Sequence, residues 1–279
     1  MGGPIYKLIN EKAIQFSFVK DYYAGKMDHI TFLQYLNKHK EQLIEAGLND
    51  GEIQLLSRFP SNDAEAATRM LHSLYDAGAI SSNTCHEQAF QDFRTRVEKI
   101  FKHLPNRTTS IFPEEARIAF ELSMAIRPKH IVVAGSYYNY FAVWFISGLA
   151  NDSRMTCIDI DPQVCELARL NMKALGYEDR VQVICGDAEI YLQNEKGPMD
   201  LFVVDAYGGF NHLDARYHGK AIYGPLVKAA LPHMQKGAYI LAHNAEEKSK
   251  DLREFFEAVS DATFSMSLNT TEHVAVYQL

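Results

Sequence analysis

Acidic and imidazole side chains follow several apolar runs in the second half of the chain. Asp159 ends one run, Asp187 and Asp205 come just after two others, and His243 and Asn244 follow a fourth. If these runs are parallel strands, their carboxyl ends share one edge of the sheet, where such sheets bind ligands. Carboxylates there accept hydrogen bonds or ligate metal ions, and a histidine donates or removes a proton. The pattern predicts a ligand site, with His243 as its candidate general base or substrate-orienting donor.

Asp159 and Asp161 flank one strand end and have different expected roles. Asp161 precedes Pro162, an arrangement typical of a helix N-cap with proline at the first helical position. Asp159, at the last position of the strand, is placed like the acid that binds the ribose of a nucleoside cofactor. Its two oxygens match a vicinal diol. We therefore expect Asp159 to bind a cofactor.

The spacing of apolar residues from 111 onward alternates short β-rich runs with amphipathic helices. Strands are expected at residues 131–134, 155–160, 181–185, 201–204, 238–242, 263–268 and 274–277. Helices are expected at residues 113–126, 141–149, 162–175, 222–231 and 252–259. The alternation predicts an α/β fold, a Rossmann-like doubly wound sheet of seven strands covered on both faces. The last two strands have a link too short for a crossover helix, so one strand must be antiparallel.

Residues 1–110 have helical apolar spacing throughout and lack such runs. We therefore expect an all-helical N-terminal domain over residues 1–110, a cap for substrate binding or dimerisation, followed by the sheet domain over residues 111–279. Tyr22 and Tyr23, between two expected helices, are the candidate substrate contacts of this cap.

The chain is acidic, with 28 Lys and Arg against 35 Asp and Glu over 279 residues. No block of basic residues is present, which argues against nucleic acid as a partner. Met1 is not followed by an apolar leader, and the uncharged residues 131–151 are interrupted by Gly-Ser-Tyr-Tyr-Asn-Tyr, so we expect a cytoplasmic protein without a membrane partner. The four cysteines form no CxxC pair and are expected to be reduced; Cys157, Cys165 and Cys185 are expected in the core.

Residues 111–279 resemble the class I S-adenosylmethionine-dependent methyltransferases, and among them the small-molecule O-methyltransferases of the catechol and caffeoyl-CoA type. The matching stretches are SIFPEEARIAFELSMAIRPKHIVVAG, CIDIDPQVCELARLNMKALGYEDRVQVICGDAEIYL, MDLFVVDAYGG and KGAYILAHN. The second is the most specific, because it combines the ribose acid, the following helix and a Gly-Asp-Ala after the third strand.

The resemblance implies S-adenosylmethionine as cofactor and gives its contacts. Asp159 would hold the ribose, Asp187 the adenine amino group, Ala188 the side of the ring, and Gly135 the methionine portion. The cofactor set is completed by Ser136, Ile160 and Asp205. The glycine loop departs from the family pattern, since Gly135 is followed by Ser-Tyr-Tyr-Asn, in which Asn139 can still adopt a positive φ.

A second departure concerns metal. Metal-dependent members carry an Asp after the fourth strand and an Asp-Asn pair after the fifth, whereas this chain has Asp205, then His243 and Asn244. Imidazole is a poor ligand for Mg²⁺. We therefore expect no functional Mg²⁺ site, and a transition metal held by Asp205 and His243 stays open.

The predicted function is methyl transfer from S-adenosylmethionine to a small, aromatic or amino-acid-like molecule, with O, N or C as the acceptor atom. His243, Asp205, Asn244 and Tyr207 are the candidate catalytic residues, and a homodimer stays open. One alternative is transfer of an aminopropyl or aminocarboxypropyl group, as in spermidine or nicotianamine synthase. The other is a binding module that kept the fold and lost the chemistry.

Overall fold

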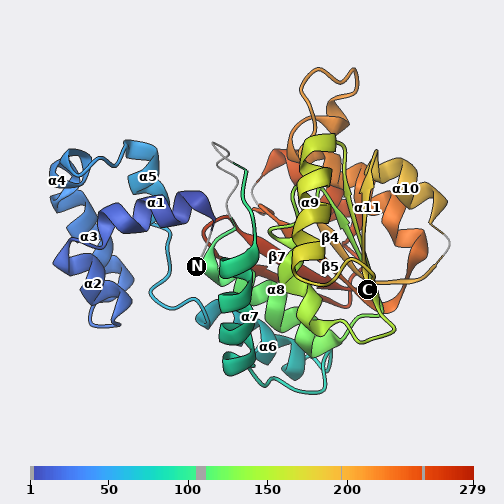
Figure 1. The fold of residues 1–279 in the computed structure, drawn as a ribbon, viewed down its shortest axis with the longest axis horizontal. Helices are drawn as coiled ribbons and strands as arrows, with labels where there is room; N and C mark the ends of the chain where they lie inside the picture. The colour runs from blue at the N-terminus through green and yellow to red at the C-terminus, as the bar shows by residue number, and fades with distance from the viewer. Residues whose placement is uncertain (1–2, 105–110, 196, 247–248) are drawn as a thin grey trace.

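The computed structural model describes residues 3–104, 111–195, 197–246 and 249–279. Its centre is a seven-stranded sheet with the strand order β3-β2-β1-β4-β5-β7-β6 (Figure 1). The strands are β1 (His130–Ala134), β2 (Arg154–Asp159), β3 (Val181–Cys185), β4 (Met199–Val204), β5 (Met234–His243), β6 (Phe264–Leu268) and β7 (Val274–Gln278). Neighbours among β1–β5 are parallel, and β7 runs antiparallel to β5 and β6. The predicted sheet is confirmed.

The register of the sheet decides which side chains meet at its carboxyl edge. Ala134 of β1 pairs with Ile158 of β2 and Val204 of β4, and Val204 pairs with Ala242 of β5. The residue after each of these positions therefore emerges at the same level. The four residues brought together in this way are Gly135, Asp159, Asp205 and His243.

Helices cover both faces of the sheet. The α-helices are α1 (Pro4–Ala13), α2 (Ser17–Tyr23), α3 (His29–Lys38), α4 (Lys40–Glu45), α5 (Asp50–Leu56), α6 (Glu65–Asp76), α7 (Glu87–Ile100), α8 (Pro113–Ile126), α9 (Pro162–Ala174), α10 (Ala188–Asn194), α11 (Tyr223–Ala230) and α12 (Arg253–Ala258). The 3₁₀ turns are η1 (Ala142–Gly148), η2 (Ala215–Tyr217), η3 (Lys220–Ile222), η4 (Leu231–His233) and η5 (Lys250–Leu252). Two differences from expectation stand out: residues 142–148 form a 3₁₀ rather than an α-helix, and α10 was not expected.

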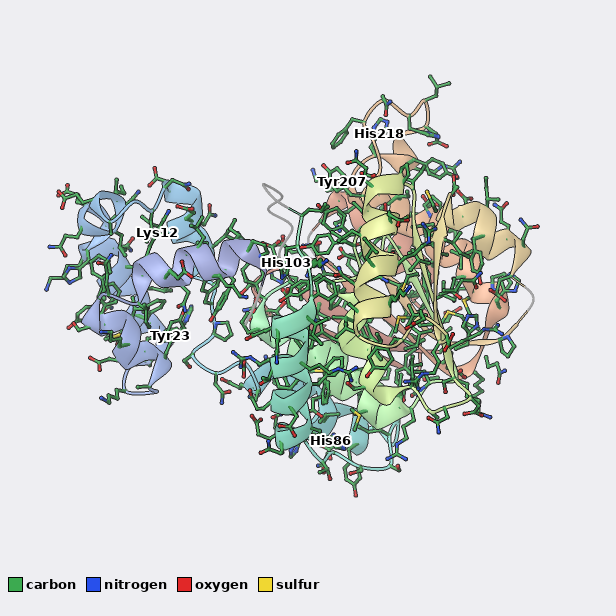
Figure 2. The ribbon with its side chains drawn as sticks, in the orientation of Figure 1. Lys12, Tyr23, His86, His103, Tyr207 and His218 are labelled. Carbon is green, nitrogen blue, oxygen red and sulfur yellow. The ribbon has the colours of Figure 1, made fainter. Side chains whose placement is uncertain are left out.

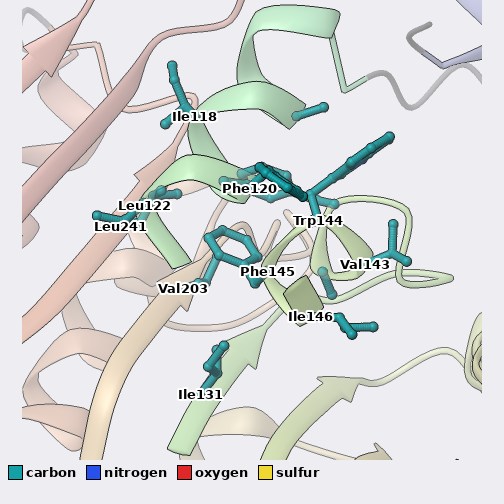
Figure 3. Close-up of a cluster of buried hydrophobic side chains, with 14 of the residues drawn as sticks. Ile118, Phe120, Leu122, Ile131, Val143, Trp144, Phe145, Ile146, Val203 and Leu241 are labelled. Carbon is teal, nitrogen blue, oxygen red and sulfur yellow. The ribbon is translucent and has the colours of Figure 1, made fainter. Parts of the chain in front are cut away.

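Two hydrophobic clusters hold the sheet between its helices. One joins β1, β4 and β5 to α6–α9 and η1, with Trp144, Phe120 and Phe145 fully buried at its centre (Figure 3). The other joins the opposite face to α10, α11 and α12 through Leu192, Tyr223 and Phe255. Strands buried on both faces read as continuous apolar runs, which is why the sequence identified them.

The helical N-terminal region has two parts with different cores. Helices α1–α5 form their own cluster, which also includes Phe59 and Phe112, and stand to one side of the sheet (Figure 1). Helices α6 and α7 instead share a core with the sheet. The predicted boundary between residues 110 and 111 adjoins residues 105–110, which lie outside the described residues, so it stays a prediction.

Residues 131–151 form β1, a loop and η1, and within the described ranges every helix is too short or too polar to cross a bilayer. All four cysteines are free. Cys157 and Cys165 are buried as expected, but the prediction of a core position for Cys185 is wrong, because this residue is exposed at the end of β3 near the sheet edge.

Candidate active site

Two adjoining cavities open at the carboxyl edge of the sheet. The smaller, of about 540 Å³, contains Asp187 and Ala188, and the larger, of about 790 Å³, contains Asp205 and His243. Both are lined by Gly135, Asp159 and Tyr207, so the two cavities form one continuous cleft. The strand-end residues selected from the sequence are therefore brought together.

The loop after β1 forms the floor of this cleft. Gly135 has φ 78°, and a Cβ at this position would overlap the backbone of Ala206, so only glycine fits. The backbone N–H groups of Gly135 and Ser136 both donate to the carbonyl of Ile158. The Ser136 hydroxyl is buried, lines the larger cavity and has no hydrogen-bond partner among the described residues. Asn139 has φ 67°, as the sequence allowed.

Asp159 joins this loop to β2. Its carboxylate accepts hydrogen bonds from the backbone N–H of Tyr137 at 2.8 Å and of Asp161 at 3.1 Å. Burial raises its pKa, while these bonds oppose the change. Asp161 caps α9 by accepting from Gln163 N, as predicted. Ile160 is largely exposed and lines the smaller cavity.

Asp187 has a structural role that the sequence analysis missed. Its side chain caps α10, accepting from the backbone N–H of Glu189 at 2.8 Å and of Ile190 at 3.4 Å through one oxygen, Oδ1. The signal was present, since aspartate is a preferred N-cap residue, but α10 itself was not predicted. Asp187 is exposed and lines the smaller cavity next to Ala188.

His243 lies between two carboxylates. Its Nε2 atom is 3.1 Å from Oε2 of Glu115 in α8, and its Nδ1 atom is 3.1 Å from Oδ1 of Asp205. The first contact has hydrogen-bond geometry, whereas Nδ1 has no aligned acceptor, so its attraction to Asp205 is one of charge. Glu115 also accepts from Thr270 and from the backbone of Glu272 in the β6–β7 link.

Lys220 is a residue of the cleft that the sequence analysis missed. Its ammonium group donates to Oδ1 of Asp205 at 2.9 Å and to the hydroxyl of Tyr223 at 2.8 Å, and its side chain lines the larger cavity. The Tyr223 hydroxyl in turn donates to the carbonyl of His243. Lys220 and His243 therefore converge on the same oxygen of Asp205.

Two glycines bring Lys220 back to the strand end. Gly208 and Gly219 exchange backbone hydrogen bonds of 2.9 Å in each direction and close the loop that begins after Asp205. A Cβ on Gly208 would overlap the carbonyl of Tyr217, and Gly219 has φ 53°. Lys220 follows this closure directly, so the glycine of the DAYGG stretch positions a cation 12 residues later.

The charges of neighbouring side chains shift the pKa values of His243 and Asp205. Burial alone would lower the pKa of His243, but the carboxylates of Asp205 and Glu115 raise it to about 10. Burial alone would raise the pKa of Asp205, but the positive charges of Lys220 and His243 hold it well below its usual range. His243 is therefore an imidazolium, and Asp205 a carboxylate, at neutral pH.

The other predicted catalytic residues lie at the rim. Tyr207 is 66% exposed and lines both cavities. Asn244 has φ 53° and donates to Glu272 through its side chain while lining the larger cavity.

The structure places Tyr22 and Tyr23 outside the lining of this cleft, so their role as substrate contacts stays a prediction. Tyr22 is buried inside the helical cluster, where its hydroxyl donates to the carbonyl of Phe59 and its ring stacks on Phe32. Tyr23 lines a separate cavity of about 490 Å³ and lies among the helices far from Tyr207 (Figure 2). The cap residues that do line the larger cavity are Ile5 and Leu55.

The donor set does not fit Mg²⁺. Asp205, the one hard-oxygen ligand after β4, has a lysine ammonium 2.9 Å from its Oδ1 atom, and the next strand offers a protonated histidine. Among the described residues, no group of three or more His, Cys, Asp or Glu side chains is arranged to hold a metal ion.

The residues do fit a nucleoside cofactor with a polar tail. The carboxylates of Asp159 and Asp187 face one cavity, and the unpartnered hydroxyl of Ser136 lies in the other beside the Gly135 backbone. The lack of a side chain at Gly135 lets the backbone of this loop pack directly against that of Ala206.

Comparison with known proteins agrees with the methyltransferase class that the sequence resembles. Residues 132–245 match a family model described as a methyltransferase domain. The O-methyltransferase imqG of Aspergillus flavus is 29% identical over 171 residues, covering 59% of this chain and 64% of that protein. A catechol O-methyltransferase of Mycobacterium tuberculosis is 26% identical over 98 residues, covering 35% and 44%.

A polyamine aminopropyltransferase of Neisseria meningitidis is 34% identical over 89 residues, covering 32% of this chain and 33% of that protein. The chain thus spans less than two-thirds of the length of these curated relatives. Among solved structures, the O-methyltransferase TomG of Streptomyces achromogenes, in complex with S-adenosylmethionine, superposes with a TM-score of 0.51 at 17% identity, covering 72% of this chain and 91% of that one. That likeness concerns the fold. The family model and the relatives agree with the class and cofactor predicted from the sequence over the part of the chain that they cover.

Proposed function

We propose that this chain carries a class I S-adenosylmethionine-dependent methyltransferase domain of the catechol and caffeoyl-CoA O-methyltransferase type. From this premise we infer that the protein methylates an oxygen of a small aromatic molecule. The observation that carries the proposal is the single cleft that joins the strand-end carboxylates Asp159 and Asp187 to the charged cluster at His243. One end of the cleft suits an adenosine and the other a polar acceptor.

The chain's own residues divide the binding work. Asp159 would hold the ribose, Asp187 and Ala188 the adenine, and Gly135 with Ser136 the methionine tail. Ile160, exposed at the rim of the smaller cavity, would cover the ring. When bound, the cofactor supplies an electrophilic methyl group on a sulfonium. The protein then has to align the acceptor with that methyl group and exclude water.

The acceptor half of the cleft is built for a planar, apolar molecule with one polar atom. Phe112, Tyr138, Tyr140 and Phe141 line it, and they are all buried. Ile5 of the helical region adds an apolar contact from above the sheet edge. Aromatic side chains pack favourably against an aromatic ring, so this lining favours a phenol-like acceptor over an amino-acid-like one.

Of the two roles predicted for His243, the geometry favours the substrate-orienting donor. A histidine whose pKa is about 10 already carries its proton at neutral pH and cannot take another. Its Nδ1–H group, buried 3.1 Å from Asp205 Oδ1 without an aligned acceptor, is the donor that we assign to the acceptor oxygen. Asp205 keeps the imidazolium charged, and Glu115 fixes the ring from the other side.

Calorimetric titration with S-adenosylhomocysteine tests this function. We expect one site per chain, with binding weakened by Asp159→Ala. An absence of binding to the folded wild-type protein would overturn the proposal in favour of a module that kept only the fold.

The alternative of aminopropyl transfer has one observation in its favour, the partial similarity to an aminopropyltransferase. The hydrogen-bond donors at the acceptor end disfavour it, since a cationic diamine needs acceptors and would meet the N–H groups of Lys220 and His243 instead. The two reactions leave different products: methyl transfer releases S-adenosylhomocysteine, and aminopropyl transfer releases methylthioadenosine.

A further inference from the structure

We propose that Lys220 takes the place of a divalent cation in this cleft and binds the ionised oxygen of the acceptor, so that the chain selects acidic hydroxyl groups such as those of phenols and enols. This inference rests on the proposed function and specifies its substrate class. Lys220 would serve two functions: it neutralises the charge of Asp205, and it binds the acceptor oxygen.

The first argument is the position of the ammonium group. Asp205 follows β4 at the sheet edge, where a carboxylate could hold a cation, and Lys220 Nζ lies 2.9 Å from its Oδ1 atom. The side chain is 20% exposed and lines the larger cavity. The Lys220 ammonium group therefore already occupies the position beside Asp205 that a metal cation would take.

The second argument is the number of hydrogen-bond donors. An ammonium group has three N–H donors. Among the described residues, Asp205 and the Tyr223 hydroxyl accept two of them, and Tyr223 is itself held by the His243 carbonyl. One donor thus lacks a protein acceptor in a cavity lined by aromatic rings, and an acceptor oxygen can take it.

The third argument is charge. Glu115 and Asp205 are balanced by His243 and Lys220, so the buried cluster is close to neutral before any ligand binds. A bound sulfonium adds a positive charge nearby, and an oxyanion acceptor restores neutrality. The proton of the acceptor hydroxyl leaves to solvent as the anion binds. The oxyanion then forms the new O–C bond with the methyl carbon while the C–S bond breaks and its electron pair stays on sulfur.

The test uses para-nitrophenol, whose anion is yellow, as a probe that reports its own ionisation. With EDTA and sinefungin present, an analogue of the cofactor whose ammonium group stands in for the sulfonium, we expect the wild-type protein to bind the yellow anion and to ionise the probe at a lower pH than in water. Lys220→Met should weaken binding of the anion about tenfold or more, because a charge-assisted hydrogen bond is lost. Lys220→Arg, which keeps the charge, should retain most of it.

Lys228→Met is the matched control, since Lys228 lies on α11 nearby but pairs with Glu254 at the surface. We expect it to bind the anion as the wild type does. If Lys220→Met does not fold, Lys220→Gln keeps donors for Asp205 without the charge, and the same loss is expected.

The proposal is overturned if the wild-type protein does not bind the anion, if Lys220→Met or Lys220→Gln binds it equally well, or if EDTA abolishes binding and Mg²⁺ restores it. Calorimetry with S-adenosylhomocysteine on the same samples separates the two claims. Cofactor binding without any effect of Lys220 refutes only this inference, whereas a lack of cofactor binding refutes the proposed function.

Discussion

His243 at the end of β5 and Glu115 in the first turn of α8 form a buried pair, with 3.1 Å between Nε2 and Oε2 and side-chain exposures of 4% and 0%. The pair joins the carboxyl edge of the sheet to α8. Because Glu115 also accepts from the β6–β7 link, a change at His243 is expected to affect both stability and catalysis.

The pair predicts how stability depends on pH. The pKa of His243 is raised from 6.5 to about 10 in the folded chain, so its protonation stabilises the fold fully below 6.5. That contribution is lost as the pH rises through about 10. Urea unfolding at a series of pH values should therefore show a fall in the free energy of unfolding across this window.

In His243→Gln, the fall in the free energy of unfolding between pH 6.5 and about 10 should be smaller by the contribution of His243. His72→Gln, on the exposed face of α6, should show the same fall as the wild type. Glu114, whose pKa burial raises to about 8, adds a fall at lower pH, between its ordinary value of 4.5 and about 8. Equal slopes above pH 8 in the wild type and His243→Gln would contradict the raised pKa of His243.

The cofactor assignment predicts weaker binding of S-adenosylhomocysteine by Asp159→Ala and Asp187→Ala. A hydrogen bond to a charged group contributes about 1.5 to 3 kcal/mol, or roughly tenfold to over a hundredfold in Kd. Asp187→Asn separates binding from capping, because asparagine caps α10 equally well but carries no charge. Asp152→Ala, at an exposed position, is the control. Unchanged affinity in both folded alanine variants would show that the adenosine lies elsewhere.

The lysine at Asp205 predicts metal-independent turnover. Dialysis against EDTA should leave kcat and KM unchanged once an acceptor is in hand, because Asp205 is already paired with a cation. Loss of activity that Mg²⁺ restores would show that a metal displaces Lys220.

The cap predicts where the acceptor lies. Ile5→Trp adds bulk to the larger cavity and should raise KM for the acceptor by about tenfold, corresponding to ~1.4 kcal/mol, without changing the Kd of S-adenosylhomocysteine. Tyr23→Phe, in the separate cavity, should change neither. The reverse result would restore Tyr23 as the substrate contact.

The strand-end residues were predictable because parallel strands impose a register. Buried apolar runs gave the strands, and the residue after each run emerges at the shared edge. This is why Gly135, Asp159, Asp205 and His243 were found from the sequence alone. Asp161 was predicted as a helix cap because aspartate is preferred at the N-cap and proline at the first helical position, a signal that needs no tertiary contact.

Lys220, Glu115 and the cap contacts were not predictable in the same way. Lys220 reaches Asp205 only because Gly208 and Gly219 close a loop, and Glu115 reaches His243 across 128 positions of the chain. Tyr22 was chosen for its place between helices, yet its hydroxyl is taken by the Phe59 carbonyl inside the helical cluster. Such contacts depend on tertiary packing that local spacing does not encode.

The central claim is best tested by product analysis with S-adenosylmethionine labelled in its methyl group and a panel of phenols. The account predicts that mass spectrometry finds the label on the phenolic oxygen and an equal amount of S-adenosylhomocysteine. Formation of methylthioadenosine, with no label on any phenol, would contradict it and identify a transfer of the aminopropyl type.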